Sequence, residues 1–333
     1  MGDLSRRLRL FDRVRQGGFV LVFHEIAPER FAEAIDSLGA RRPVHLSELI
    51  ERASRGATTR GLFAITVDDG VGENVRGLVE VLLRRSWPAT FYLPVDYVGG
   101  GRAMQFQWWR KVEPFLRSYP PDFFARLDPA TGASSLPGLS AALHRLWRTA
   151  KPDAYLPLTM RLVETVIRDQ DLDAAVLKPP DAVSWGEVES MSRSALIRFE
   201  SHGMSHTAMA ALSDGELDAE LKQSRDTISA HTGRPCRHLA YPFGGMDSIG
   251  ERAVWTARLY YDSAAAMLPG RVDGANPWLL PRIALYPENS RQSMRLKVEL
   301  GSRGLRPPQL LLRTRAAAAV RKRPAALAAA GPE

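Results

Sequence analysis

Cysteine is almost absent from the 333-residue sequence, in which Cys236 is the single example. One thiol excludes an internal disulfide framework and a cysteine-rich zinc module. Long apolar runs are also missing, since no stretch approaches the roughly 18–20 residues that a membrane-spanning helix needs. The apolar run nearest the start, residues 19–23, is too short for a span or for most signal-peptide cores. We therefore expect a soluble protein in the cytoplasm.

The body of the chain carries almost no net charge. The whole sequence carries +8, but residues 301–333 carry +6 and residues 1–15 carry +3, which leaves −1 on the rest. A nearly neutral body does not favour nucleic-acid binding, so we expect no nucleic-acid partner. We interpret residues 1–17 as a basic N-terminal segment and residues 301–333 as a basic Ala- and Pro-rich tail without a stable fold. This tail could touch an acidic surface weakly and keep the protein at the periphery of the inner membrane.

The chain is 45% hydrophobic and 25% charged, which is typical of a globular protein. Its short β-rich apolar runs predict strands at residues 19–23, 62–67, 89–95, 195–199, 237–241, about 259–265 and 282–286. Its amphipathic stretches predict helices at residues 29–39, 48–54, 74–86, 184–191, 214–232 and 247–258, with Ser47 and Ser184 as N-caps and Gly233 after a C-terminus. This alternation predicts a parallel α/β fold over residues 18–300. Residues 100–180 break the rhythm and are interpreted as a mainly helical insertion.

Polar side chains follow several of these strands directly. His24 ends the first strand, Asp68-Asp69 the second, and His202 and His206 come after the strand at 195–199. The carboxyl ends of parallel strands meet at one edge, where ligands bind in α/β sheets and barrels. Each motif alone has a structural explanation, but their joint placement predicts a functional site.

Two imidazoles and one carboxylate form a common open zinc site that leaves a position for water. His202 and His206 are four residues apart, so one helical turn would bring both rings to the same ion. The side chains of two adjacent aspartates point in different directions, so one can bind metal while the other faces the water. This division of roles provides an activated water and a general base, which are sufficient to hydrolyse an amide or ester.

Three motifs carry a family resemblance. Residues 66–70 (TVDDG), 201–206 (SHGMSH) and 239–244 (LAYPFG) resemble, in order and spacing, the motifs of the polysaccharide deacetylases, the NodB-homology or carbohydrate esterase 4 family. The resemblance covers about residues 18–290 and implies an irregular (β/α)7 barrel. The aromatic segment at 105–110 and residues 280–283 also resemble members from cell-envelope polysaccharide biosynthesis.

The resemblance implies roles for individual residues. Asp68 would be the general base, and the loop at Tyr241 and Pro242 would bind substrate, with the Tyr241 amide holding the oxyanion. The implied ligands of a divalent metal, usually zinc and sometimes cobalt or nickel, are Asp69, His202 and His206.

Three departures from the family pattern alter this assignment. Gly203 stands where the second motif has Ser or Thr, which should cost a local hydrogen bond. Ala240 stands where the third motif has an Arg that pairs with the catalytic Asp, and Arg282 could supply that charge instead. The C-terminal Leu-x-His that provides the general acid is missing, but residues 20–25 resemble that strand moved to the front. The chain therefore resembles a circularly permuted member, with His24 as the acid.

Aromatic side chains near the site could stack on sugar rings. The candidates are Trp108, Trp109 and Trp185, for each of which core packing is the alternative.

We expect a metal-dependent hydrolase that removes N-acetyl groups from a sugar or polysaccharide, so that the substrate is an acetylated amino sugar. One alternative is a deformylase or amidase acting on a small metabolite. Another is a carbohydrate-binding barrel without catalysis. The sequence does not indicate which saccharide is used or the oligomeric state.

Overall fold

The computed structural model describes residues 17–100, 112–127, 132–173 and 181–305. Residues 1–16 of the expected N-terminal segment, Trp108 and Trp109, and the tail from residue 306 onward lie outside the described residues. Within the described ranges, no helix is both long and apolar enough to cross a membrane. The expected membrane contact, cellular location and domain boundaries remain predictions.

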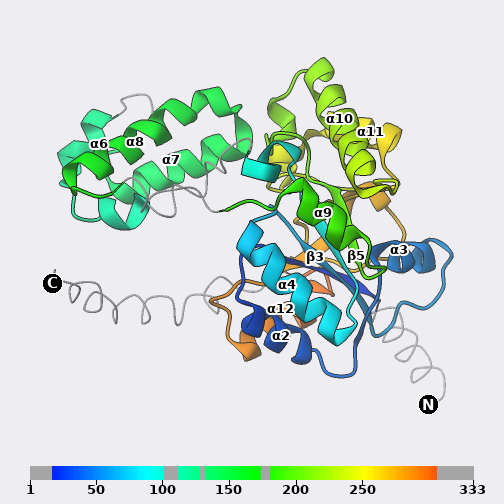
Figure 1. Cartoon of the computed structure of the whole chain (residues 1–333). Coiled ribbons are helices and arrows are strands. Elements are labelled where there is room, and N and C mark those ends of the chain that lie inside the picture. Colours follow the sequence, from blue (N-terminus) through cyan, green and yellow to red (C-terminus); the bar gives the residue numbers. More distant parts are fainter. Residues whose placement is uncertain (1–16, 101–111, 128–131, 174–180, 306–333) are drawn as a thin grey trace, which may run out of the picture.

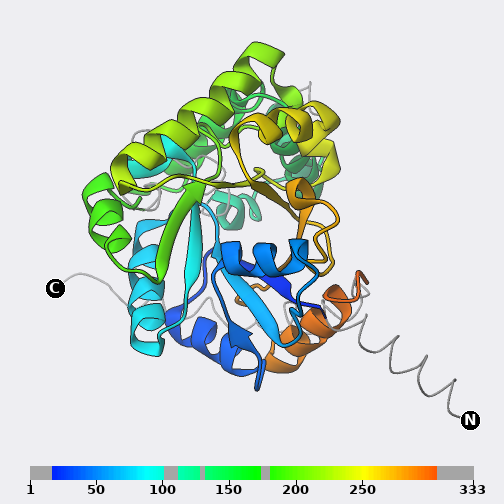
Figure 2. The ribbon, with the colours of Figure 1, turned by 90° about the vertical axis from the view of Figure 1, so that its right-hand side faces the viewer.

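Seven parallel strands of the described chain pair in a closed ring. Figure 2 shows strands at the centre of the molecule with helices around them. The strands are β1 (Phe19–Phe23), β3 (Leu62–Val67), β4 (Ala89–Leu93), β5 (Ile197–Ser201), β6 (His238–Ala240), β7 (Ser263–Ala266) and β8 (Leu280–Ala284). The ring closes because β1 pairs with β8 on one side and with β3 on the other. A two-residue strand, β2 (Arg42–Pro43), pairs only with β3. This architecture confirms the expected (β/α)7 barrel.

The barrel strands are short and apolar because both of their faces are covered. All five residues of β1 are buried, as are five of the six in β3. One face of each strand fills the barrel interior and the other lies under the outer helices, which is the usual environment of parallel strands. The continuous apolar runs of the sequence follow from this double burial.

Helices surround the ring and bury one face each (Figure 1). They are α2 (Pro28–Asp36), α3 (Leu46–Ser54), α4 (Gly72–Arg85), α9 (Trp185–Ser192), α10 (Asp214–Thr232), α11 (Met246–Tyr260) and α12 (Arg291–Gly301). In α4, for example, Val75, Leu78 and Leu82 lie on the buried face. Their three- and four-residue spacing places them on one stripe of the helix.

Two of the three expected helix ends are confirmed. Ser184 caps α9 in a capping box with Glu187, and Gly233 follows α10 in the left-handed conformation (φ 64°). The expected cap at Ser47 is wrong, because α3 begins at Leu46 with His45 in the N-cap position. The Ser47 hydroxyl instead bonds Nε2 of His238 at 2.8 Å.

Three further differences concern element boundaries and elements that were not predicted. Helix α11 continues to Tyr260, so β7 begins only at Ser263. Helix α12 and the two-residue β2 have no counterpart among the expected elements. β2 has only two residues, and α12 is mostly polar, so neither carries the strong apolar pattern on which a sequence-based assignment depends.

The insertion is mainly helical, as expected. Its described helices are α6 (Pro121–Leu127), α7 (Leu136–Thr149) and α8 (Leu156–Asp169), which stand to one side of the barrel in Figure 1. They pack around a core of their own that includes Leu139, Leu143 and Leu162. An ion pair at 2.8 Å between Arg148 and Asp247 joins α7 to the start of α11.

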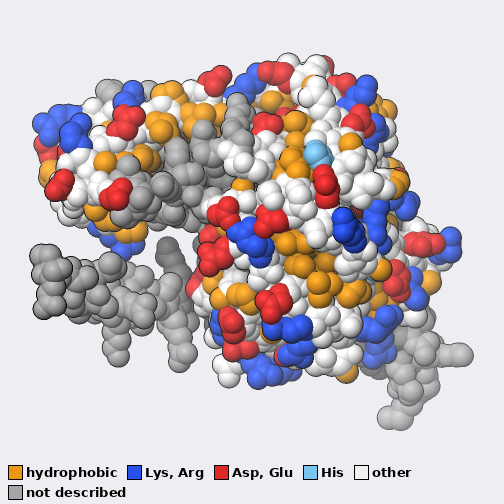
Figure 3. Space-filling model, viewed as in Figure 1, with side chains coloured by type: hydrophobic (Ala, Val, Ile, Leu, Met, Phe, Trp, Pro, Cys, Tyr) orange, Lys and Arg blue, Asp and Glu red, His pale blue; other side chains and the backbone are white. Residues whose placement is uncertain are grey.

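Acidic and basic side chains are interspersed over the face of the barrel seen in Figure 3. Ion pairs in the described chain include Arg76 with Glu187 and Arg85 with Asp36. This face therefore shows no single-sign patch of the kind that tracks a phosphate backbone.

Candidate active site

The expected site residues converge at the carboxyl ends of the strands, which we call the barrel mouth. His24 directly follows β1, Asp68 and Asp69 follow β3, and His202 follows β5. Tyr241 follows β6 in the same way. The closed parallel ring brings these strand ends to one rim, although they are far apart in the sequence.

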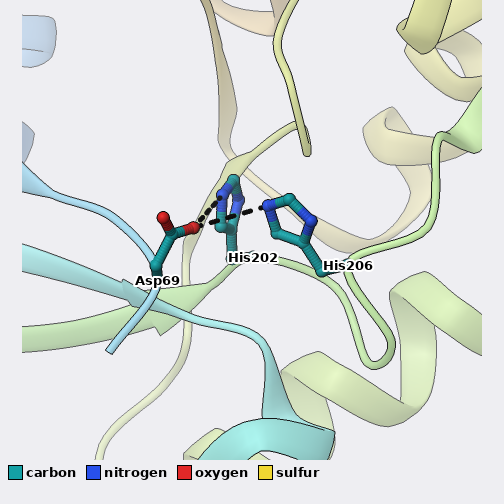
Figure 4. A group of neighbouring side chains, drawn as sticks. All are labelled: Asp69, His202 and His206. Atoms are coloured by element: carbon teal, nitrogen blue, oxygen red, sulfur yellow. Dashed lines mark ion pairs between the residues drawn. The ribbon is translucent and has the colours of Figure 1, made fainter. Parts of the chain in front are cut away.

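Asp69, His202 and His206 form a buried cluster (Figure 4), and their candidate ligand atoms all lie within 4.8 Å of one another. The Nε2 atoms of His202 and His206 lie 3.7 and 3.4 Å from Oδ1 of Asp69. These distances are longer than a normal N–H···O hydrogen bond. One carboxylate oxygen and two imidazole nitrogens that face each other across such gaps match the donor set of a divalent metal.

The His202 ring is oriented by the backbone. Its Nδ1 lies 2.7 Å from the Ala240 carbonyl oxygen, which requires a proton on Nδ1 and leaves the lone pair on Nε2 facing Asp69. Burial lowers the pKa of His202 to about 4, so the ring is neutral near pH 7. A neutral imidazole whose far nitrogen donates to a carbonyl is the usual form of a histidine metal ligand.

Two of the three cluster residues have unusual backbone conformations. Asp69 (φ 78°) and His206 (φ 57°) both lie in the left-handed region, although neither is glycine. Such residues cost of order 1–3 kcal/mol each and persist where the surrounding structure holds them. The strain here aims two ligand side chains at a common point.

Asp68 is paired with a buried arginine. Nη1 of Arg282 on β8 donates to Oδ1 of Asp68 at 2.7 Å, and both side chains are almost fully buried. Burial alone would raise the pKa of Asp68, but the Arg282 guanidinium, together with His202, holds that pKa below its usual value. Arg282 thus provides the charge that is missing at Ala240, from a strand two places along the ring.

His24 lies on the other side of Asp68. Its Nε2 is 4.0 Å from Oδ2 of Asp68, and its side chain remains 27% exposed. The ring stacks on Tyr286, with centroids 6.4 Å apart. His24 is therefore the more accessible of the two groups and faces the mouth.

The structure contradicts the expected role of the Tyr241 amide. That N–H donates to the Ala265 carbonyl at 3.1 Å as part of the contact between β6 and β7. It is therefore not available to an oxyanion. The Tyr241 hydroxyl donates to the Trp278 carbonyl at 3.1 Å. Tyr241 still lines the cavity at the mouth, whereas Pro242, next to it, is buried and is not among the lining residues.

Trp185 does not reach the mouth. It opens α9 and stacks on His231 of α10, with centroids 3.9 Å apart. Trp185 is not one of the described residues that line the cavity. Its large apolar surface is used in packing two outer helices, which was the alternative for this tryptophan.

A cavity of about 440 Å³ opens over the cluster. Of the described residues expected at the site, all except Pro242 and Trp185 line this cavity. Phe243 also lines the cavity and belongs to the third motif. The lining residues that the sequence did not single out are Glu113, His144, Trp147, Arg148, Met267 and Tyr286. Four of these, Glu113, His144, Trp147 and Arg148, belong to the insertion. The sequence predicted that the insertion is mainly helical, but not which side of it lines the cavity.

Residues 154–258 match the family model for polysaccharide deacetylases. The matched segment includes His202, His206 and the loop after β6, whereas the two aspartates lie before it. Comparison with curated protein sequences finds no match.

Solved structures share the barrel. A polysaccharide deacetylase from Bacillus cereus is 15% identical with a TM-score of 0.54, over 85% of this chain and 69% of that one. IcaB from Ammonifex degensii is 16% identical with a TM-score of 0.54, over 85% and 97%. The deacetylase PplD of Streptococcus pyogenes, solved with acetate, is 12% identical with a TM-score of 0.53, over 84% and 97%. At these identities the likeness shows a common fold.

The circular permutation is not tested by these comparisons and remains a prediction. The match over residues 154–258 and the shared barrel confirm the resemblance to the polysaccharide deacetylase family that the three motifs predict.

Proposed function

We propose that this protein is a metal-dependent deacetylase that removes N-acetyl groups from an amino sugar or a polysaccharide. The observation that carries the proposal is the cluster of Asp69, His202 and His206 beside the paired Asp68 at the barrel mouth. The structures of polysaccharide deacetylases with the same barrel support it.

The cluster fits a divalent ion, with zinc as the first choice. All three side chains are buried, and both imidazoles present Nε2 to the carboxylate. Once bound, the ion would polarise the acetyl carbonyl and lower the pKa of water. Three protein ligands leave a coordination position open for substrate, as in catalytic zinc sites.

Asp68 is the group we assign as general base. Its Oδ1 is engaged by Arg282, while Oδ2 faces the imidazoles of His24 and His202. The lowered pKa keeps Asp68 ionised near neutral pH, so it can accept a proton from the attacking water. Arg282 holds the carboxylate in position while the proton is transferred.

His24 is the group we assign as general acid. It lies across Asp68 from Arg282 and lines the cavity, and its side chain is the more exposed of the pair. Histidine is the side chain that most often transfers protons as a general acid or base. In this role His24 donates a proton to the leaving amine as the C–N bond breaks. The products are acetate and a free amino sugar.

The amide of Phe243 replaces that of Tyr241 as the oxyanion donor we propose. Phe243 lines the cavity, and its ring packs on His206 with centroids 4.8 Å apart. Its backbone is left-handed (φ 62°), and within the described chain its N–H donates to no other group. A fixed N–H at the mouth is suited to stabilising charge that develops on a carbonyl oxygen.

Acetate release tests the proposal. The zinc-loaded protein would be incubated with oligomers of N-acetylglucosamine, beside Asp68→Asn and the control Glu251→Gln on the exposed side of α11. We expect acetate from the wild type and the control, and at least about 100-fold less from Asp68→Asn, the scale of general-base catalysis. Release of formate from N-formyl substrates, without acetate from any acetylated sugar, would contradict the proposal in favour of the amidase alternative.

A further inference from the structure

The loop that joins the two histidines, residues 202–206, is held by backbone hydrogen bonds on one side. The His202 amide donates to the Leu93 carbonyl at 3.0 Å. The carbonyls of Gly203 and Met204 accept from the amides of Val95 and Asp96 at 3.1 and 2.8 Å. These contacts come from the end of β4 and from the 3-10 turn η1 (Val95–Gly100). They leave the amides of Met204 and Ser205 without a backbone partner.

Glu220 of α10 satisfies those amides. Its Oε1 accepts from the Met204 N–H at 2.9 Å and from the Ser205 N–H at 2.8 Å. The Ser205 hydroxyl also donates to both carboxylate oxygens, at 3.0 and 3.1 Å. The Glu220 side chain is buried, and these donors are all neutral. No basic side chain of the described chain forms an ion pair with it. Burying an unpaired carboxylate is costly, so its hydrogen bonds to the loop must compensate.

Gly203 is the position at which the chain departs from the Ser or Thr of the family motif. Its backbone is left-handed (φ 81°), and a Cβ there would lie 2.8 Å from Oε1 of Glu220. Any side chain at residue 203 would therefore displace the carboxylate from the loop. The Glu220 carboxylate can approach the loop this closely only because residue 203 has no side chain.

We propose that Glu220 is a positioning residue for the metal site, which holds the 202–206 loop in the one conformation that aims both imidazoles at Asp69. The inference rests on the proposed metal-binding function. Glycine at position 203 lacks the hydroxyl that Ser or Thr would provide there. We infer that the Glu220 carboxylate, from an outer helix, provides hydrogen bonds to this loop in its place. This role of Glu220 also accounts for the left-handed backbone of His206, which follows directly after the amides that Glu220 holds.

Zinc affinity tests this inference without reference to turnover. The metal-free protein would be titrated with zinc against a chromophoric chelator, for the wild type, Glu220→Ala and Glu220→Gln. We expect Glu220→Ala to bind zinc about 10–100-fold more weakly, the usual effect of losing support behind metal ligands. Glu220→Gln should stay within about threefold of the wild type, because its amide oxygen can still accept from both N–H groups.

The matched control is Asp226→Ala, which removes a half-exposed carboxylate from the same helix, where it pairs with Arg225. This variant should bind zinc like the wild type. Wild-type affinity in a folded Glu220→Ala variant would overturn the inference. If that variant does not fold, hydrogen exchange in the metal-free wild type decides: slow exchange at the Met204 and Ser205 amides supports the inference, and fast exchange at both overturns it.

The zinc-affinity series and the acetate-release assay can fail independently of each other. A protein that binds zinc but releases no acetate refutes the deacetylase proposal, and the affinity series still decides the role of Glu220. A wild type that does not bind zinc overturns both proposals together.

Discussion

The carboxylates of Asp68 and Asp69 are neighbours in the chain but have different partners. Asp68 faces Arg282, and Asp69 faces the Nε2 atoms of two histidines. The left-handed backbone at Asp69 (φ 78°) is what separates the two directions. One carboxylate thus remains paired with a cation while the other faces the candidate metal position.

Replacing Arg282 should damage both folding and activity. Arg282→Met leaves Asp68 as a buried carboxylate without its cation, and breaking a buried pair in this way costs about 3–5 kcal/mol. We expect a lower free energy of unfolding and a fall in kcat of at least about 100-fold, while zinc binding persists because Arg282 does not contact the three ligands. Denaturant titration, acetate release and zinc content measure these effects.

The control for Arg282 is Arg237→Ala, which breaks an exposed pair with Asp262. Exposed pairs contribute about 0–1 kcal/mol, so this variant should differ little from the wild type. Equal kcat in Arg282→Met and the wild type would show that Asp68 does not depend on the guanidinium.

At the scale of elements, His238 at the amino end of the barrel joins α3, β6 and β7. His238 on β6 bonds Ser47 of α3 through Nε2 and Ser263 of β7 through Nδ1, each at 2.8 Å. Burial lowers the pKa of His238 to about 4. The ring is therefore neutral in the folded protein, and its two hydrogen bonds need no charge.

His238 should make stability depend on pH. Its folded pKa of about 4 lies below the unfolded value of about 6.5, so the unfolded chain binds more protons between these values. Stability should then rise with pH from 4 to 6.5 and be lost on acidification, by about 3 kcal/mol. His202 has the same lowered pKa and contributes in the same sense, so His238→Gln should reduce this slope without abolishing it. Urea titrations across the range measure it, and an unchanged slope in the variant would refute the assignment.

The position of α7 over the barrel mouth is a second feature at this scale. His144, Trp147 and Arg148 bring one side of this helix to the cavity, and the ion pair of Arg148 with Asp247 fixes it to α11. The insertion therefore forms a wall of the cavity, to which it contributes the edge of a mostly buried aromatic ring and a cation.

Arg148→Ala should weaken substrate binding more than catalysis. We expect KM to rise about tenfold with kcat within twofold, the pattern that follows from losing contacts made equally in the ground and transition states. Arg145→Ala, an exposed arginine of the same helix outside the cavity lining, is the control. A drop in kcat at constant KM would place Arg148 in the chemistry instead of in substrate binding.

At the scale of the whole molecule, most of the barrel could be predicted from sequence because its strands are short apolar runs followed by distinctive polar residues. The cluster of Asp69, His202 and His206 followed from the same strand ends. The sequence left open whether Arg282 pairs with Asp68 or lies elsewhere. No local pattern indicates the order of strands around a ring. The structure decides it by placing β8 next to β1.

The remaining features depend on contacts that no local pattern shows. The Tyr241 amide matched a motif, but β7 takes its hydrogen bond. Glu220 lies on an amphipathic helix, where a polar residue normally indicates a solvent-facing position. The cavity wall of α7 is set by tertiary packing of the insertion against the barrel. Contacts between segments that are distant in the chain cannot be predicted from local residue patterns.

Metal content directly tests whether Asp69, His202 and His206 hold a divalent ion. Elemental analysis of the purified wild type, after incubation with zinc and removal of the excess, should find about one ion per chain. His202→Ala and Asp69→Ala should lose it, and His231→Ala, on the outer helix α10, should keep it. A wild type that holds no metal after this treatment, or variants that retain it in full, would contradict the proposed site and the mechanism built on it.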